Sequence, residues 1–428
     1  MTKKPIVLVV IALSASLIAA DDHDRPPIRY SDSQPADSIA SLSVRMNKQE
    51  VNLQHHGGQG YLPSLLEALG ISRSSQILVF SKTSLQRQRI NPRKPRALYF
   101  NDHVTIGFCQ SGDVLEITAA DRNLGTVFYT LDQEKSARPV FKRETERCLI
   151  CHGASATQGF PGHMIRSVAT DQTGELLLSR GSRRVDHATP LEERWGGWYV
   201  TGTVENHRHM GNMFFNSRFE ADTPENGKTI ALENVIKGSE YLEPGSDIVA
   251  LMVLEHQLEA HNRLVRANYL TRMALAEQAE VNRLMGSPAN YRSEGITRRI
   301  ERACEPVVEY LLFSGEAKLS GRVTGTSDFA KAFESLGPFD SKRRTLRTFD
   351  LRTRMFQHPM SYVVYSELFD GLPSEARNRI YKRFWEILAL KKEDGRYRHL
   401  SFEDRNAILE IMRETKNNLP EYWNKKPS

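Results

Sequence analysis

The fold class of this 428-residue chain is decided by five apolar runs: QILVF (76–80), RALYF (96–100), VTIGFC (104–109), DVLEITAA (113–120) and GTVFYTL (125–131). Each run is rich in β-branched and aromatic residues, which favour strands. Pro, Asn-Asp, Ser-Gly-Asp and Asn-Leu-Gly turn signals separate the runs. The pattern therefore predicts a series of strands in the N-terminal half of the chain.

Helical patterns lie on both sides of these strands. Upstream, residues 37–70 contain two of them, SIASLSVRMNK and LPSLLEALG. Downstream, a long helical pattern extends from Asp247 to Met285. Shorter helical segments follow near 297–313, 326–335, 373–390 and 402–415. The chain is therefore predicted to have an α+β fold, with a β-containing N-terminal half and a mainly helical C-terminal half.

The stretch between these halves has a different composition. Residues 154–230 are rich in glycine and turn-forming residues. Within it we expect short strands at GELLLS (174–179) and GWYVTGTV (197–204). Just before it, KRETERCLICHG (142–153) reads as a short helix entered from an extended segment.

The N-terminus has the layout of a secretory signal. Lys3 and Lys4 precede an apolar run over residues 5–20, and an acidic cluster follows Ala20 directly. We expect cleavage near Ala20 and an exported, periplasmic protein, with an uncleaved membrane anchor as the alternative. Removal of the two lysines lowers the formal charge from +6 to +4. This mild, dispersed surplus does not imply binding to nucleic acid.

Two of the four cysteines form the motif Cys148-Leu149-Ile150-Cys151-His152. C-x-x-C-H is the attachment signature of c-type haem. Two thiols three positions apart on one helical turn reach the two vinyl groups on one edge of a porphyrin, and the next histidine is placed to ligate the iron. The motif therefore predicts one covalent haem c, held by Cys148, Cys151 and His152.

Other readings of the cysteines stay open. A C-x-x-C pair also occurs in thioredoxin-like dithiols, although no βαβ pattern surrounds this one. A zinc site would need Cys109 and Cys304 as further ligands. A disulfide within the motif would be strained. Cys109 and Cys304 are expected either to pair with each other or to remain two buried thiols.

CLICHG resembles the haem-binding segment of c-type cytochromes. More widely, the chain is similar to an uncharacterised family of exported bacterial cytochrome c-domain proteins. The similar stretches include KPRALYFNDHVTIGF, LGTVFYTLDQ, ERCLICHG, PLEERWGGWYVTGT, RHMGN and DIVALMVLEHQ. The resemblance implies covalent haem but no particular activity. With it, the predicted organisation is a signal peptide at 1–20, a polar linker or arm at 21–36, an α+β haem-c-binding region at 37–240 and a mainly helical region at 241–428.

The sixth iron ligand is nominated by position along the chain. His209 or Met210 is the first candidate, because the distal Met of small c-type cytochromes also follows the motif after a long glycine-rich loop. The further candidates are His207, Met213, His163, Met164, His256, His261, His358 and Met360. A methionine ligand would raise the reduction potential and a second histidine would lower it.

Two roles are possible for each group of residues expected near the haem. Trp195, Trp198 and Tyr199 are expected either to pack in the core or to contact the haem. Arginines are expected either to be solvated or to pair with haem propionates; they are Arg180, Arg183 and Arg184. The basic stretch from Arg87 to Arg96 is interpreted as a solvated loop, or as a patch for propionates or an acidic partner.

Three functions are compatible with these residues. The first is a monohaem cytochrome that passes single electrons to a periplasmic redox partner protein. The second is a haem enzyme with an open distal site, and the third is a haem-based sensor or binding module. An electron carrier is favoured over a catalyst, because no convincing acid–base pair accompanies the motif.

Overall fold

The computed structural model describes residues 22–215, 231–236, 240–390 and 394–425. The expected signal peptide at 1–20 lies outside these ranges. The largest sheet in the described ranges has seven antiparallel strands in the order β6-β5-β4-β3-β2-β1-β9. The strands are β1 (Ile77–Val79), β2 (Arg96–Phe100), β3 (Val104–Phe108), β4 (Val114–Asp121), β5 (Gly125–Asp132), β6 (Phe141–Arg143) and β9 (Trp198–Tyr199). Each of the five apolar runs is thus confirmed as a strand.

Alternate residues of β4 and β5 define the two faces of this sheet. Leu115, Ile117 and Tyr129 point to the face covered by α1 (Ser38–Asn47) and α2 (Leu62–Ala68). Asp37 fastens α1 to this face, because its carboxylate caps the helix and also accepts a 2.7 Å hydrogen bond from the Tyr129 hydroxyl. The opposite face carries Thr118 and Phe128, which are cross-strand neighbours.

The arm before α1 packs against the sheet. Tyr30 is fully buried, and its hydroxyl donates to the carbonyl of Thr126 in β5 at 2.9 Å. The Arg143 guanidinium donates to the carbonyls of Tyr30 and Ser33. This polar, proline-containing segment is therefore held against strands β5 and β6.

One of the two short strands expected after the motif is absent and the other is divided. GELLLS forms a single bridge, between Leu176 and Thr170, and then a 3-10 turn. Its expectation as a strand is wrong, because the Asp171 carboxylate folds the chain back by accepting from the N–H groups of Thr173 and Glu175. GWYVTGTV splits into β9 and β10 (Thr203–Val204), which pairs with β11 (Val323–Thr324).

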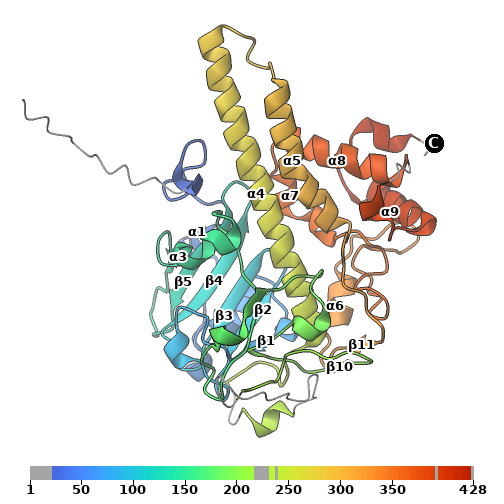
Figure 1. Cartoon of the computed structure of the whole chain (residues 1–428). Helices are drawn as coiled ribbons and strands as arrows, with labels where there is room; N and C mark the ends of the chain where they lie inside the picture. Colours follow the sequence, from blue (N-terminus) through green and yellow to red (C-terminus); the bar gives the residue numbers. More distant parts are fainter. Residues whose placement is uncertain (1–21, 216–230, 237–239, 391–393, 426–428) are drawn as a thin grey trace, which may run out of the picture.

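The C-terminal half is mainly helical, as predicted. Its helices are α4 (Ile248–Met285), α5 (Glu294–Leu311), α6 (Phe329–Ser335), α7 (Glu367–Asp370), α8 (Ser374–Leu388) and α9 (Phe402–Thr415). Asp247 caps the start of α4, and Gly286 with a φ of 63° ends it. Figure 1 shows α4 running past the sheet and projecting beyond it beside α5. No helix in the described ranges is both long and apolar enough to cross a membrane.

Helix α4 joins the two halves. It is buried on nearly every side from Ile248 to His261, and one apolar core contains residues of both the sheet and the helices. Gln257 donates to the carbonyl of Asn101 in the β2–β3 turn, and the Tyr269 hydroxyl donates to the carbonyl of Leu124 in the β4–β5 turn. The helix is therefore a rigid support along the turns of the sheet.

Candidate functional site

The C-x-x-C-H motif forms a single helical turn shortly after β6, which is an edge strand of the sheet. Helix α3 spans Leu149–His152 with Cys148 at its N-cap, and it lies beside β5 in Figure 1. The His152 N–H donates to the carbonyl of Cys148 at 2.9 Å, and Leu149 anchors the turn in the core. This turn leaves Cys148 half-buried and Cys151 exposed, and both are free thiols.

The ring of His152 is oriented by a backbone carbonyl. Its Nδ1 lies 2.8 Å from the carbonyl oxygen of Gly162, and its ring lies 5.0 Å from that of Phe128. A carbonyl only accepts, so Nδ1 carries the proton and Nε2 has the lone pair. Burial lowers the pKa of His152, which keeps the imidazole neutral. Among the described residues nothing hydrogen-bonds to Nε2, so this nitrogen is available as a metal ligand.

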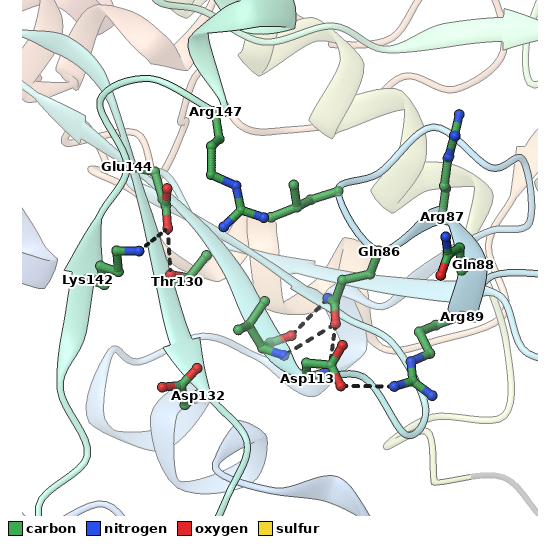
Figure 2. Close-up of a pocket in the computed structure, with 12 residues that line it drawn as sticks. Gln86, Arg87, Gln88, Arg89, Asp113, Thr130, Asp132, Lys142, Glu144 and Arg147 are labelled. Carbon is green, nitrogen blue, oxygen red and sulfur yellow. Dashed lines mark hydrogen bonds and ion pairs between the residues drawn. The ribbon is translucent and has the colours of Figure 1, made fainter.

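A cleft of about 670 Å³ opens beside the motif. Its lining comes from the 85–89 loop, strands β4, β5 and β6, and the segment before Cys148. Figure 2 shows Arg147, Glu144 and Lys142 on one side of it and Arg89 and Asp113 on the other. The volume is within the range of small-molecule and cofactor sites, roughly 300–1,000 Å³.

The charges of this cleft are partly paired. Arg89 lies 2.9 Å from Asp113, and Lys142 lies 3.7 Å from Glu144. Within the described ranges Arg87 and Arg147 have no ion-pair partner. Leu85 and Val114 are the apolar members of a mainly polar lining. The cleft therefore suits the carboxylate edge of a haem better than its apolar faces. The basic loop contributes Arg87 and Arg89 to it.

Neither first-choice distal ligand contacts the motif. His209 is buried, its Nδ1 accepts from the Gly211 N–H at 3.0 Å, and its ring meets Trp195 edge-on at 5.2 Å. Because Nδ1 accepts, Nε2 carries the proton in the neutral ring and is not free to ligate. Met210 accepts a weak hydrogen bond from Ser167 at 3.8 Å and packs on a small separate apolar cluster, which includes Met213.

The other candidates are also engaged elsewhere. His163 follows Gly162, whose carbonyl bonds His152, but the ring nitrogens of His163 contact hydroxyls of Thr118 and Thr126. His256 contacts His187 through Nδ1 and Ser361 through Nε2. His207 accepts from the N–H of Ser320 through Nε2 at 2.7 Å. The last four candidates have no hydrogen bond to α3 in the described residues: Met164, His261, His358 and Met360.

The aromatic residues after the motif have protein partners. The indole of Trp195 donates to Glu255, that of Trp198 donates to the carbonyl of Arg166, and the Tyr199 hydroxyl donates to the carbonyl of Pro92. These contacts match the core-packing interpretation.

The three nearby arginines are engaged as well. Arg183 pairs with Glu193, Arg184 donates to the carbonyl of Ala156, and Arg180 lies 4.5 Å from the ring of Phe215. Their expected role toward propionates has no support from these contacts.

Cys109 follows β3 directly, and Cys304 lies in α5. Both are buried, free thiols. Burial raises the pKa of each to about 12. In the described residues no group of three or more His, Cys, Asp or Glu side chains is arranged to hold a metal ion. The structure therefore gives no support to a four-cysteine zinc site.

Two residues near the motif were missed by sequence reasoning. His23 is buried, and a Cβ atom on Gly153 would lie 3.5 Å from its Cε1. Asn262 of α4 bonds the loop that carries Gly162. Neither has a local sequence signal, because each reaches the motif from a distant part of the chain.

No protein-family profile, curated protein or solved structure matches this chain.

Proposed function

We propose that the chain is an exported monohaem c-type cytochrome that carries single electrons for a periplasmic redox partner protein. Cys148 and Cys151 would hold the haem, since each S–H adds across a vinyl C=C to give a C–S bond and a C–H bond without an oxidant. His152 would be the proximal iron ligand. The haem, when bound, supplies the one-electron chemistry. The secretory layout of residues 1–20 supports export.

The observation that carries the proposal is the hydrogen bond between His152 Nδ1 and the Gly162 carbonyl. Histidines that ligate a metal almost always donate their other ring N–H to a carbonyl, a carboxylate or water. The bond fixes the tautomer whose Nε2 lone pair is free. It is present together with two free thiols on the same helical turn, which is the donor set that a covalent haem requires.

The cleft and the exposed surface support the same assignment. Arg87 and Arg147 are unpaired cations in the described residues and suit propionate carboxylates. Ile150, between the two cysteines, is 76% exposed, and Val140 is 73% exposed. Apolar side chains beside a haem edge suit transient docking of a redox partner.

A second candidate function rests on where the structure places the candidate sixth ligands of the iron. The ring nitrogens of His163 and His256, and Nδ1 of His209, are engaged with other protein groups of the described residues, which favours an open or exchangeable position on the iron. An open position would suit a haem enzyme or a haem-based sensor that binds a small gas molecule.

A redox titration with a carbon monoxide test separates these functions. The protein is produced with a c-type haem maturation system, and its visible spectrum is followed against potential. An electron carrier gives a reversible one-electron transition, and its ferrous form binds carbon monoxide slowly or not at all. Immediate carbon monoxide binding favours the second candidate. A protein without any redox-active chromophore contradicts both.

A further inference from the structure

Two hydrogen bonds between His152 and Gly162 join the ends of the loop that orients the His152 ring. The Gly162 carbonyl accepts from His152 Nδ1, and the Gly162 N–H donates to the His152 carbonyl at 2.9 Å. The Thr157 hydroxyl donates to the same His152 carbonyl at 3.0 Å. The position of the Gly162 peptide therefore sets the position of the imidazole.

Asn262 of α4 holds this loop from outside. Its Oδ1 accepts from the N–H of His163 at 2.8 Å, and its Nδ2 donates to the carbonyl of His163 at 2.9 Å. Nδ2 also donates to Glu259 one turn earlier at 3.2 Å, which fixes the orientation of the amide. Both backbone groups of the residue after Gly162 are thus bonded to α4, just after its fully buried stretch ends at His261.

The fit between Asn262 and the loop is tight. A Cβ atom on Gly162 would lie 2.5 Å from Oδ1 of Asn262, which is closer than atoms can approach. Glycine at this position allows the asparagine to reach the backbone. The contact explains why the loop turns at a residue without a side chain.

The side chain of His163 fastens the loop on its other side. Its Nε2 lies 2.9 Å from the hydroxyl of Thr118 in β4, and its Nδ1 lies 3.4 Å from that of Thr126 in β5. Burial lowers the pKa of His163 well below its usual value, so the ring is neutral. The loop is therefore clamped between the sheet and α4.

We propose that Asn262 and His163 are positioning residues that hold His152 as an axial ligand, and that His163 does not itself bind the iron. The proposal rests on the proposed function. A firm hydrogen bond to Nδ1–H increases the basicity of a ligating imidazole, and such supporting partners change metal affinity about 10–100-fold. A more basic imidazole favours ferric over ferrous iron, so the clamp lowers the reduction potential.

Asn262→Leu tests the clamp, with Asn268→Leu as the matched control. Asn268 is another asparagine of α4, more buried than Asn262, and it donates to the carbonyls of Arg122 and Gly371 and not to the loop. A tenfold change in the relative ferric affinity of His152 shifts a one-electron potential by about 59 mV. We expect Asn262→Leu to raise the potential by at least this much and the control to leave it within a small fraction of that value. Equal shifts in both variants would overturn the proposal.

A second readout needs no haem. In the haem-free protein, nitrogen NMR of His152 is expected to show protonation at Nδ1 alone, and Asn262→Leu is expected to show both tautomers. An unchanged tautomer in the variant would overturn the clamp. Absence of covalent haem in the wild type, with the tautomer shift intact, would instead contradict the proposed function and leave the clamp standing.

The tight contact provides a coupling test. Gly162→Ala pushes Asn262 away, so alone it should reproduce the potential shift. In an Asn262→Ala background the colliding atom is gone, and Gly162→Ala should then add little. Strictly additive effects would show that the two residues act independently and would overturn the proposal.

His163→Gln distinguishes positioning from ligation. A ligand role predicts that the substitution changes the spin state of the iron from that of the wild type, whereas a positioning role predicts the wild-type spin state with a raised potential. A change of spin state would overturn the assignment of His163.

Discussion

Replacing Arg194 with methionine should destabilise the protein in a pH-dependent way. Arg194 and Glu255 form an ion pair with exposed fractions of 3% and 0% for the two side chains. The guanidinium also donates to the carbonyls of Thr189 at 2.6 Å and His187 at 2.9 Å. Methionine fills most of the space but leaves two buried carbonyls and one carboxylate without a cation. Each unsatisfied buried group costs about 1–3 kcal/mol.

The pH dependence follows from the carboxyl of Glu255. Burial raises its pKa to about 7, against the pull of Arg194, which lowers it. The pKa of Glu255 is higher in the folded protein than in the unfolded chain. The contribution of the protonated Glu255 carboxyl to the free energy of unfolding is therefore present at low pH and is lost as the pH rises toward the pKa of the folded state. Without Arg194 the folded pKa rises further, so the variant continues to lose about 1.4 kcal/mol per pH unit above pH 7. The wild type does not.

Urea unfolding at pH 6, 7 and 8.5 measures this difference. We expect the Arg194→Met penalty to be about 2 kcal/mol at pH 6 and to reach about 4 kcal/mol at pH 8.5, close to the cost of an uncompensated buried charge. His187 and His256 are neutral above pH 7, because burial lowers their pKa values. A penalty that is the same at all three pH values would contradict this role of the Glu255 carboxyl. Adding Glu255→Gln to the variant should abolish the pH dependence.

Two further predictions concern Asp37 and the buried cysteines. Asp37→Ala removes the cap of α1 and the hydrogen-bond partner of the Tyr129 hydroxyl, so we expect the free energy of unfolding to fall by about 2–4 kcal/mol. Asp328→Ala is the control, since Asp328 precedes α6 without a side-chain cap bond, and an equal loss in both variants would contradict the role of Asp37. In denatured, haem-loaded protein only Cys109 and Cys304 should react with a thiol reagent, and four reactive thiols would contradict thioether formation. Neither of these two should react in the native protein, because both are buried.

The strands and helices could be predicted because their signals are local. The run DVLEITAA is followed by a turn and then by GTVFYTL, and the two strands pair residue by residue from Val114 to Asp132. The capping residue Asp247 and the terminal Gly286 likewise precede and follow a helical pattern directly. GELLLS misled the prediction, because its apolar residues resemble a strand while the neighbouring Asp171 turns the chain.

The C-x-x-C-H motif could also be recognised from contiguous residues, but the residues that surround it in the structure come from distant parts of the chain. His152 and Gly162 are ten residues apart in the chain, and Asn262 is 99 residues from His163. No pattern in the sequence indicates such a contact. His209 and Met210 were nominated by their distance along the chain, which carries no information about the direction of a side chain. The structure places them with Trp195 and with a separate apolar cluster.

The covalent attachment of haem through Cys148 and Cys151 is tested most directly by a pyridine haemochrome spectrum. The protein is produced with a c-type haem maturation system and extracted with acid acetone before measurement. We expect a c-type band that stays with the polypeptide at one haem per chain, and that disappears in Cys148→Ala/Cys151→Ala but remains in Cys109→Ala. A colourless wild-type protein, or haem that passes into the solvent, would contradict it.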